Sequence, residues 1–399
     1  MSTTELQTEI LDPVPEPPRN RRGWLDTLLI YFLSIVLALL ISGILIAFAD
    51  QDVRDSAKYF FAQPMDTISA AWSAVSEAYK ALFSGSVINF SAYTVADAIK
   101  PFTETLYTST SLILAGLAVA LPFRAGLFNI GAQGQLILGA IVSAYIGFHY
   151  SMPFPLHLLV ALIGGLLAGA LWAGIAGVLK ARTGAHEVIV TIMLNWIAIY
   201  LLQYLLTLDL FQRPGRDDPL SPAVATTARL PKILGESYRL NFGFILALLA
   251  AWFVWWLLER STIGFEFRAV GANPNAARTA GINVRRAVTG VMVVAGSLAG
   301  LAGANQILGG ATEYALGNGI AGDVGFDAIT VALLGKSTPM GVVAAGILMG
   351  GLRAGGSAMQ AKTGTPIDIV LVVQSLIVLF IAAPPLVRSI FRLKAPAAA

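Results

Sequence analysis

The sequence contains no cysteine, which excludes disulfides, thiolate metal sites and cysteine nucleophiles. Its three histidines, His149, His157 and His186, lie far apart and show no spacing typical of a metal site. We therefore expect no metal, no cofactor and no catalytic residue. Charged residues make up only 12% of the chain, against roughly 25% in soluble domains. The net charge of +3 gives no reason to expect a nucleic-acid partner.

Hydrophobic residues, in contrast, make up 56% of the 399 residues, and the mean hydropathy is +0.73. Apolar runs long enough to cross a bilayer recur along the chain, and only helices satisfy their own backbone there. The sequence therefore predicts an all-α, polytopic membrane protein with about ten transmembrane helices. We expect these helices at residues 27–49, 104–122, 130–149, 156–179, 187–208, 242–258, 287–308, 323–335, 339–356 and 366–386.

Polar and basic segments divide the chain around these spans. Apolar residues from Pro64 to Leu82 recur at helical spacing with charges between them, which predicts an amphipathic helix on the outer membrane surface. Most of the 26 lysines and arginines fall on the side of the termini, so the positive-inside rule places both termini in the cytoplasm. We expect a disordered cytoplasmic tail at 1–26, the first span and outer segment at 27–103, a membrane core at 104–386 with a basic cytoplasmic connection at 259–286, and a cytoplasmic tail at 387–399.

The stretch LPFRAGLFNIGAQGQLILGA, residues 121–140, places polar side chains and glycines between two apolar runs. Such groups are costly at membrane depth unless they face other helices or a watery cavity. We therefore expect a broken helix that lines a transport pathway. VGFDAITVALLGK, residues 324–336, is also short and polar and lies five spans further on. The pair indicates two inverted repeats with broken helices near the midplane.

Nine polar or aromatic residues of the spans are candidates for the pathway. The alternative for each is hydrogen bonding or packing between helices. Trp196 is a candidate to stack a base or a ribose. Asp323 and Asp327 are candidates to bind ribose hydroxyls or to hold a gate. The nine are Asn129, Gln133, Gln135, Asn195, Trp196, Asn305, Gln306, Asp323 and Asp327.

The cytoplasmic connection contains a short helix with complete end signals. Asn273 is a natural N-cap, Pro274 suits the first helical position, and Gly281 suits the position after the last turn. Two turns of helix are marginal alone in water, so this helix needs a surface to dock against. The functional interpretation is a docking helix for a cytoplasmic partner, and the alternative is an ordinary basic loop. Its residues are Asn273, Pro274, Ala276, Ala277, Arg278, Ala280 and Gly281.

Three segments carry a resemblance to a known family: FRAGLFNIGAQGQ (123–135), HEVIVTIMLNWIA (186–198) and GANPNAARTAGIN (271–283). They resemble ABC-importer permeases of the ribose and branched-chain amino-acid type. The nearest members are nucleoside-uptake permeases that work with a basic-membrane-protein-type binding lipoprotein. The resemblance covers roughly residues 100–385. Relatives often read GAEGQ where this chain has Gln133, so no carboxylate role is carried over to that residue.

The resemblance implies a set of partners and a function. It implies a cytoplasmic ATPase with two nucleotide-binding domains, a second and non-identical permease subunit, an extracytoplasmic binding lipoprotein and membrane lipid. The chain would then move a nucleoside or a similar small neutral solute across the bacterial inner membrane, and the partner ATPase would hydrolyse ATP. The alternatives are a permease for ribose or another sugar, an ion-coupled secondary transporter using Asp323 and Asp327, and a membrane-embedded enzyme.

Overall fold

The computed structural model describes residues 21–215, 218–366 and 368–392, and within them all regular structure is helical apart from two isolated β-bridges. The all-α expectation is confirmed. Most of the predicted disordered tail at 1–26 and the end of the tail at 387–399 lie outside the described residues. The helices are α2 (Arg21–Ala49), α3 (Gln51–Ala57), α4 (Pro64–Ser86), α5 (Val95–Arg124), α6 (Ala132–His149), α7 (Leu156–Thr183), α8 (Glu187–Leu205), the 3₁₀ turn Thr226–Ala228, α9 (Gly243–Arg260), α10 (Thr262–Ala272), α11 (Pro274–Thr279), α12 (Val284–Leu308), α13 (Val324–Leu334), α14 (Pro339–Thr363), α15 (Asp368–Ala382) and α16 (Pro384–Ile390).

The predicted count of ten spans is not confirmed. By length and composition, seven of the described helices are able to cross a membrane, or eight if α15 and α16 form one span bent by 94°. Helices α6 and α13 lie where the third and eighth spans were expected, but they are not among these. Helix α13 has only 11 residues, and the first turn of α6 carries Gln133 and Gln135. These are the two elements that the sequence marked as broken helices.

Two spans are longer than their apolar runs because capping residues outside those runs fix the ends of the helices. Helix α5 starts at Val95, nine residues before the expected span, since the Thr94 hydroxyl accepts a hydrogen bond from the Asp97 amide at 3.1 Å. Helix α14 continues to Thr363 and ends at Gly364, whose φ of +69° is the left-handed conformation of a helix C-terminus. Hydropathy identifies the membrane-embedded part of a helix and does not detect these polar extensions.

The interior of the molecule is built on close helix contacts. Helix α5 is central, with 83% of its most apolar window buried, and α12 follows with 67%. Helices α7 and α12 approach through glycines: a Cβ added to Gly169 would lie 2.2 Å from the Gly296 carbonyl oxygen. Helix α6 meets the same face of α12 at Gly139 and Gly300. Without side chains between them, the backbones gain dense packing, which is how helices associate in lipid.

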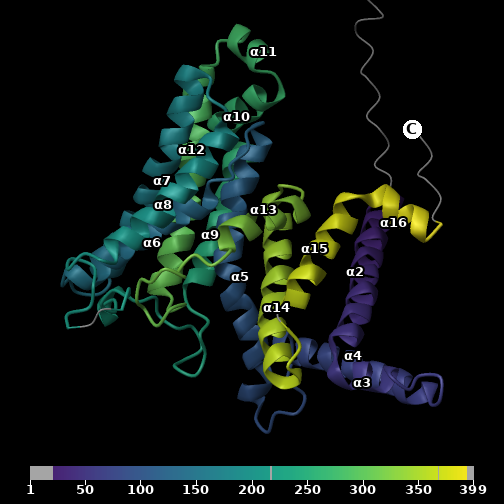
Figure 1. Ribbon diagram of the computed structural model, residues 1–399. Coiled ribbons are helices and arrows are strands. Elements are labelled where there is room, and N and C mark those ends of the chain that lie inside the picture. Colours follow the sequence, from purple (N-terminus) through teal and green to yellow (C-terminus); the bar gives the residue numbers. More distant parts are fainter. Residues whose placement is uncertain (1–20, 216–217, 367, 393–399) are drawn as a thin grey trace, which may run out of the picture.

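The connections separate the molecule into two ends. Helices α10 and α11 project at the end drawn uppermost, whereas α3, α4 and the connection between α8 and α9 lie toward the opposite end (Figure 1). Helix α4 lies across the lower end of α2, to which it is tied by the Tyr79 hydroxyl, a donor to the Leu39 carbonyl. Burial raises the pKa of Tyr79 to about 12, so the phenol keeps the proton that it donates. Helix α4 is the helix expected between Pro64 and Leu82, and Trp72 is exposed on its apolar face.

Candidate functional site

The N-termini of α6 and α13, the two elements expected to be broken helices, meet at Gln133. The Gln133 side-chain amide donates to the Gly322 carbonyl at 2.6 Å and accepts from the Gly325 amide at 2.8 Å. A Cβ added to Gly325 would lie 2.3 Å from the Gln133 Cα, so the two backbones are in direct contact. Gln133 therefore bridges two segments that lie almost two hundred residues apart in sequence.

Asn129 and Gln135 form a reciprocal amide pair beside this bridge. The Asn129 Nδ2 donates to the Gln135 Oε1 at 3.0 Å, and the Gln135 Nε2 donates to the Asn129 Oδ1 at 2.8 Å. Asn129 also donates to the Ala118 carbonyl of α5 and accepts from the Gly131 amide. Both side chains are buried. The pair fixes the loop that leads from α5 into α6.

Asn195 of α8 caps the same helix end from the other side. Its Oδ1 accepts from the Gly134 amide and its Nδ2 donates to the Ile130 carbonyl, each at 2.8 Å. These contacts join α8 to the start of α6, just as Gln133 joins α6 to α13, whereas Asn129 and Gln135 bond to each other across the loop and first turn of α6. Trp196, the next residue, points away from them: it is 52% exposed and stacks on Tyr200.

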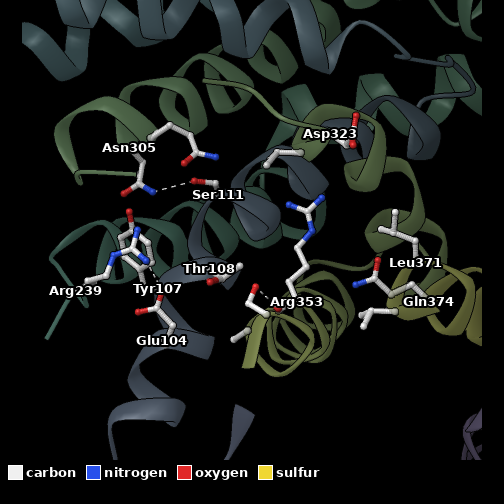
Figure 2. A pocket seen from close by; sticks show the side chains of 15 residues that line it. Glu104, Tyr107, Thr108, Ser111, Arg239, Asn305, Asp323, Arg353, Leu371 and Gln374 are labelled. Atoms are coloured by element: carbon white, nitrogen blue, oxygen red, sulfur yellow. Dashed lines mark hydrogen bonds and ion pairs between the residues drawn. The ribbon is translucent and has the colours of Figure 1, made fainter. Parts of the chain in front are cut away.

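A cavity of about 520 Å³ lies beside α13, between α5, α12, α14 and α15. Figure 2 shows its lining side chains converging from these helices and from the connection before α9. Three predicted pathway residues line it, namely Asn305, Gln306 and Asp323. Cavities of roughly 300–1,000 Å³ hold small-molecule ligands in proteins. Its full polar lining is Glu104, Tyr107, Thr108, Ser111, Arg239, Asn305, Gln306, Asp323, Arg353, Ser357 and Gln374.

Both arginines of the cavity wall are paired with acids. Arg239 binds Glu104, and its guanidinium lies 4.3 Å from the centre of the Tyr107 ring. Arg353 of α14 binds Asp327 of α13, so Asp327 is held in an ion pair. Asp323 lines the cavity at the N-cap position of α13 but makes no capping hydrogen bond. The wall therefore has little unpaired positive charge, which suits a neutral solute better than an anion.

Two buried amides of the cavity have an atom without a hydrogen-bond partner among the described residues. Asn305 donates to the Ser111 hydroxyl at 3.0 Å, but its Oδ1 lies against Gly243 and is unpaired. Gln374 of α15 is only 4% exposed, and its Nε2 has no acceptor. Figure 2 shows the Gln374 amide directed toward the space between α14 and α15.

Sequence reasoning missed several of these residues. Arg353 and Gln374 are polar residues inside the expected spans 339–356 and 366–386, and intramembrane polar groups are candidate functional residues by default. That signal was sufficient to find both. Glu104 and Arg239 carried a weaker signal, because Glu104 is the first residue of the expected span 104–122 and Arg239 lies in the polar stretch before the span at 242–258. In the described part of the chain, no group of three or more His, Asp or Glu residues is placed to hold a metal ion.

The predicted docking helix is present as α11, with its end signals in place. The Asn273 Oδ1 accepts from the Asn275 and Ala276 amides at 3.0 and 3.1 Å, Pro274 is the first helical residue, and Gly281 has a φ of +87°. Ala277 is buried within the chain at 4% exposure. The outward surface of the helix is formed instead by Pro274, Ala276, Arg278 and Ala280.

Comparison with known proteins identifies the class. Residues 102–382 match the family described as branched-chain amino acid transport system, permease component, and the chain belongs to this family. It is a membrane subunit of an ABC transporter and a multi-pass membrane protein, so the resemblance drawn from the three sequence segments is confirmed. An ABC permease works with an ATPase and a substrate-binding protein. No solved structure gave a significant match.

Several relatives have names that state a substrate. The chain is 42% identical to the guanosine ABC transporter permease protein NupP of Bacillus subtilis, over 71% of this chain and 82% of the relative. It is 35% identical to the nucleoside ABC transporter permease protein NupB of Lactococcus lactis, over 70% and 78%. It is also 35% identical to a glucose ABC transporter permease protein of Haloferax volcanii, over 70% and 75%.

Proposed function

We propose that this chain is a permease subunit of an ATP-driven importer that moves a nucleoside or a similar small neutral solute into the cell. The observation that carries the proposal is the 42% identity to a guanosine permease over most of both chains. The cavity beside α13 supports it, because its volume of about 520 Å³ suits a small solute and both of its arginines are paired with acids, so that neither is free to bind an anion. The glucose permease among the relatives makes a sugar the second candidate.

The rest of the assembly follows from this function. We infer that residues 104–386 form the permease core and that α11, within the connection 259–286, docks on an ATPase with two nucleotide-binding domains. A second, non-identical permease subunit completes the pathway, and a binding lipoprotein delivers the solute on the side of α3 and α4, which residues 27–103 contribute. The subunit would lie in the bacterial inner membrane with both termini in the cytoplasm.

The pathway residues take two roles in this proposal. Asn305, Gln306 and Asp323 line the cavity and are the candidates for contact with the solute. Gln133, which joins α6 to α13, and the side chains that fix the loop before α6 support the pathway through their hydrogen bonds, and Asp327 does so through Arg353. Trp196 faces outward and remains a candidate only for contact with lipid or a partner subunit. The supporting side chains are Asn129, Gln133, Gln135 and Asn195.

Uptake of radiolabelled guanosine by cells expressing the complete transporter tests the proposal. We expect uptake to require this subunit and an active ATPase, and to be inhibited by unlabelled nucleosides but not by glucose or ribose. Absence of guanosine uptake together with ATP-dependent uptake of radiolabelled glucose or ribose would establish the sugar alternative. Uptake that persists with an inactive ATPase and follows an ion gradient would establish a secondary transporter.

A further inference from the structure

Gln374 of α15 is a polar residue at a buried position where an apolar side chain of similar size could pack. Its side chain is 96% buried, it lines the cavity beside α13, and its Nε2 lacks an acceptor among the described residues. A buried donor without an acceptor lowers stability, whereas leucine in the same space would remove that cost. An acceptor that binds at this site would satisfy the Gln374 donor.

We propose that the cavity between α5, α12, α14 and α15 is a binding station for the transported solute within this single subunit, and that Gln374 donates a hydrogen bond to the solute. The proposal rests on the proposed function and adds the place and a contact. Figure 2 places Gln374 on the side of the cavity opposite Ser111, and Arg353 also lines the wall. Arg353 is paired with Asp327, whereas the Gln374 Nε2 is a buried donor on this wall without an acceptor among the described residues.

The surrounding groups define the chemistry of the solute. Gln374 offers a donor, and Asp323, which makes no capping bond, offers a carboxylate acceptor. The aromatic ring of Tyr107 and the hydroxyl of Ser357 complete the wall. A solute that presents a carbonyl or ring-nitrogen acceptor at one end and hydroxyl donors at the other satisfies both sides. A nucleoside has both, since its base supplies the acceptor and its ribose supplies the hydroxyls.

The first test separates this role from a structural one by measuring two properties of the same variant. Gln374→Leu removes the unpaired donor, so we expect the melting temperature of the solubilised complex to stay the same or to rise. We expect the maximal rate of guanosine uptake, with saturating binding protein, to fall at least about 10-fold, the loss expected from one unmade hydrogen bond. The KM, which the binding protein sets, should change little.

A matched control lies on the next residue. Ser375 is exposed and does not line the cavity, and its hydroxyl bonds to the Leu371 carbonyl of its own helix. Ser375→Ala should transport guanosine at the wild-type rate. Normal uptake in Gln374→Leu would overturn the proposal, and so would lost uptake accompanied by a lower melting temperature or by loss of assembly.

The absence of cysteine provides a second test. Ser357→Cys places the only thiol of the chain on the cavity wall, and Ser375→Cys places it at an exposed position of α15 that does not line the cavity. In the solubilised transporter without binding protein, we expect guanosine to slow labelling of the thiol at 357 by a water-soluble thiosulfonate, and glucose to have no effect. The rate at 375 should not respond to guanosine. Equal labelling rates at position 357 with and without guanosine would contradict the proposed binding station.

The two proposals fail in different ways. If the wild-type transporter does not take up nucleosides, the proposed function is wrong, whatever Gln374 does. If the wild-type transporter takes up guanosine while Gln374→Leu is normal and the thiol at 357 is unprotected, the proposed function stands and the station in this subunit is wrong.

Discussion

Gly126 and Gly271 lie against each other, backbone to backbone, although 145 residues separate them. A Cβ added to Gly126 would lie 3.0 Å from the Cα and the carbonyl oxygen of Gly271. A Cβ added to Gly271 would lie 2.5 Å from the carbonyl carbon of Ala125. Gly271 lies near the end of α10, two residues before the N-cap of α11, and Gly126 begins the loop from α5 into α6. The segment that carries the proposed docking helix is therefore in direct contact with the loop that leads into the candidate pathway.

This contact continues through hydrogen bonds to α13. The loop that starts at Gly126 contains Asn129, which is paired with Gln135 in the first turn of α6. Gln133 of that turn is bonded to Gly322 and Gly325 at the start of α13, beside the cavity. A displacement of α11 by an ATPase would thus have a packed and hydrogen-bonded route to the cavity wall, of the kind that can carry coupling between distant sites.

The first prediction concerns the glycine contact. Gly271→Ala should separate α10 from the loop after α5, because the new methyl group would have to displace the backbone of Ala125. We expect uptake to fall while ATP hydrolysis by the assembled transporter persists, and stability to drop by about 1–3 kcal/mol. The measurement is uptake and ATPase activity in the same proteoliposomes.

Gly290→Ala is the matched control for this prediction. Its new Cβ would meet only the Phe267 ring at 3.5 Å, an ordinary contact, and alanine favours a helix over glycine. We expect normal uptake in this variant. If Gly271→Ala also transported at the wild-type rate with tight coupling to ATP hydrolysis, the contact would have no part in transmission.

The second prediction concerns the outward face of α11. Ala276 is exposed, so Ala276→Arg disturbs no packing within the subunit, but it would place a long charged side chain in the proposed ATPase contact. We expect co-purification of the ATPase to fall at least about 10-fold, together with uptake. Ala62→Arg, at the exposed turn between α3 and α4 and far from α11, is the control and should leave co-purification of the ATPase unchanged. Ala277→Arg is a poorer test, since Ala277 is buried and the variant would damage the subunit itself.

Local signals in the sequence were sufficient for α11 and insufficient for the cavity. Asn273, Pro274 and Gly281 act within one or two turns, so their roles could be predicted without the fold. The pairing of Arg239 with Glu104 joins residues 135 apart, and the choice of partner depends on how the helices pack. The amides at 129, 133 and 135 were found as polar groups at membrane depth, but sequence alone did not distinguish a solute contact from a bond between helices.

The third prediction concerns topology. Reporter domains inserted near Gly271 and fused after Lys394 should both report the cytoplasm, and one inserted near Pro219 should report the outside, because positively charged connections are retained inside. The structure is consistent with the first and third positions, since α11 and the connection between α8 and α9 lie toward opposite ends of the molecule (Figure 1). Reporters near Gly271 and Pro219 that give the same side would contradict both the span arrangement and the inverted repeat.

The fourth prediction concerns Gln133, which is 4% exposed and uses both ends of its amide. Gln133→Leu leaves the Gly322 carbonyl and the Gly325 amide without their partner, at about 1–3 kcal/mol for each group that stays unsatisfied. We expect a lower melting temperature and a loss of uptake, because α6 and α13 would no longer be fixed to each other. A normal melting temperature with lost uptake would instead support direct contact between Gln133 and the solute.

Gln133→Glu separates the two hydrogen bonds of the same side chain. An ionised carboxylate still accepts from the Gly325 amide and benefits from the two helix N-termini, but it has no proton to donate to the Gly322 carbonyl. A protonated carboxyl group makes both bonds. The melting temperature of Gln133→Glu should therefore lie between that of wild type and that of Gln133→Leu. Its difference from the wild-type melting temperature should shrink as the pH falls from about 8 to about 5, because protonation restores the donor. If the relative melting temperature of Gln133→Glu does not change with pH, the bond to Gly322 contributes little, and the contact between α6 and α13 depends on the Gly325 bond and on backbone packing.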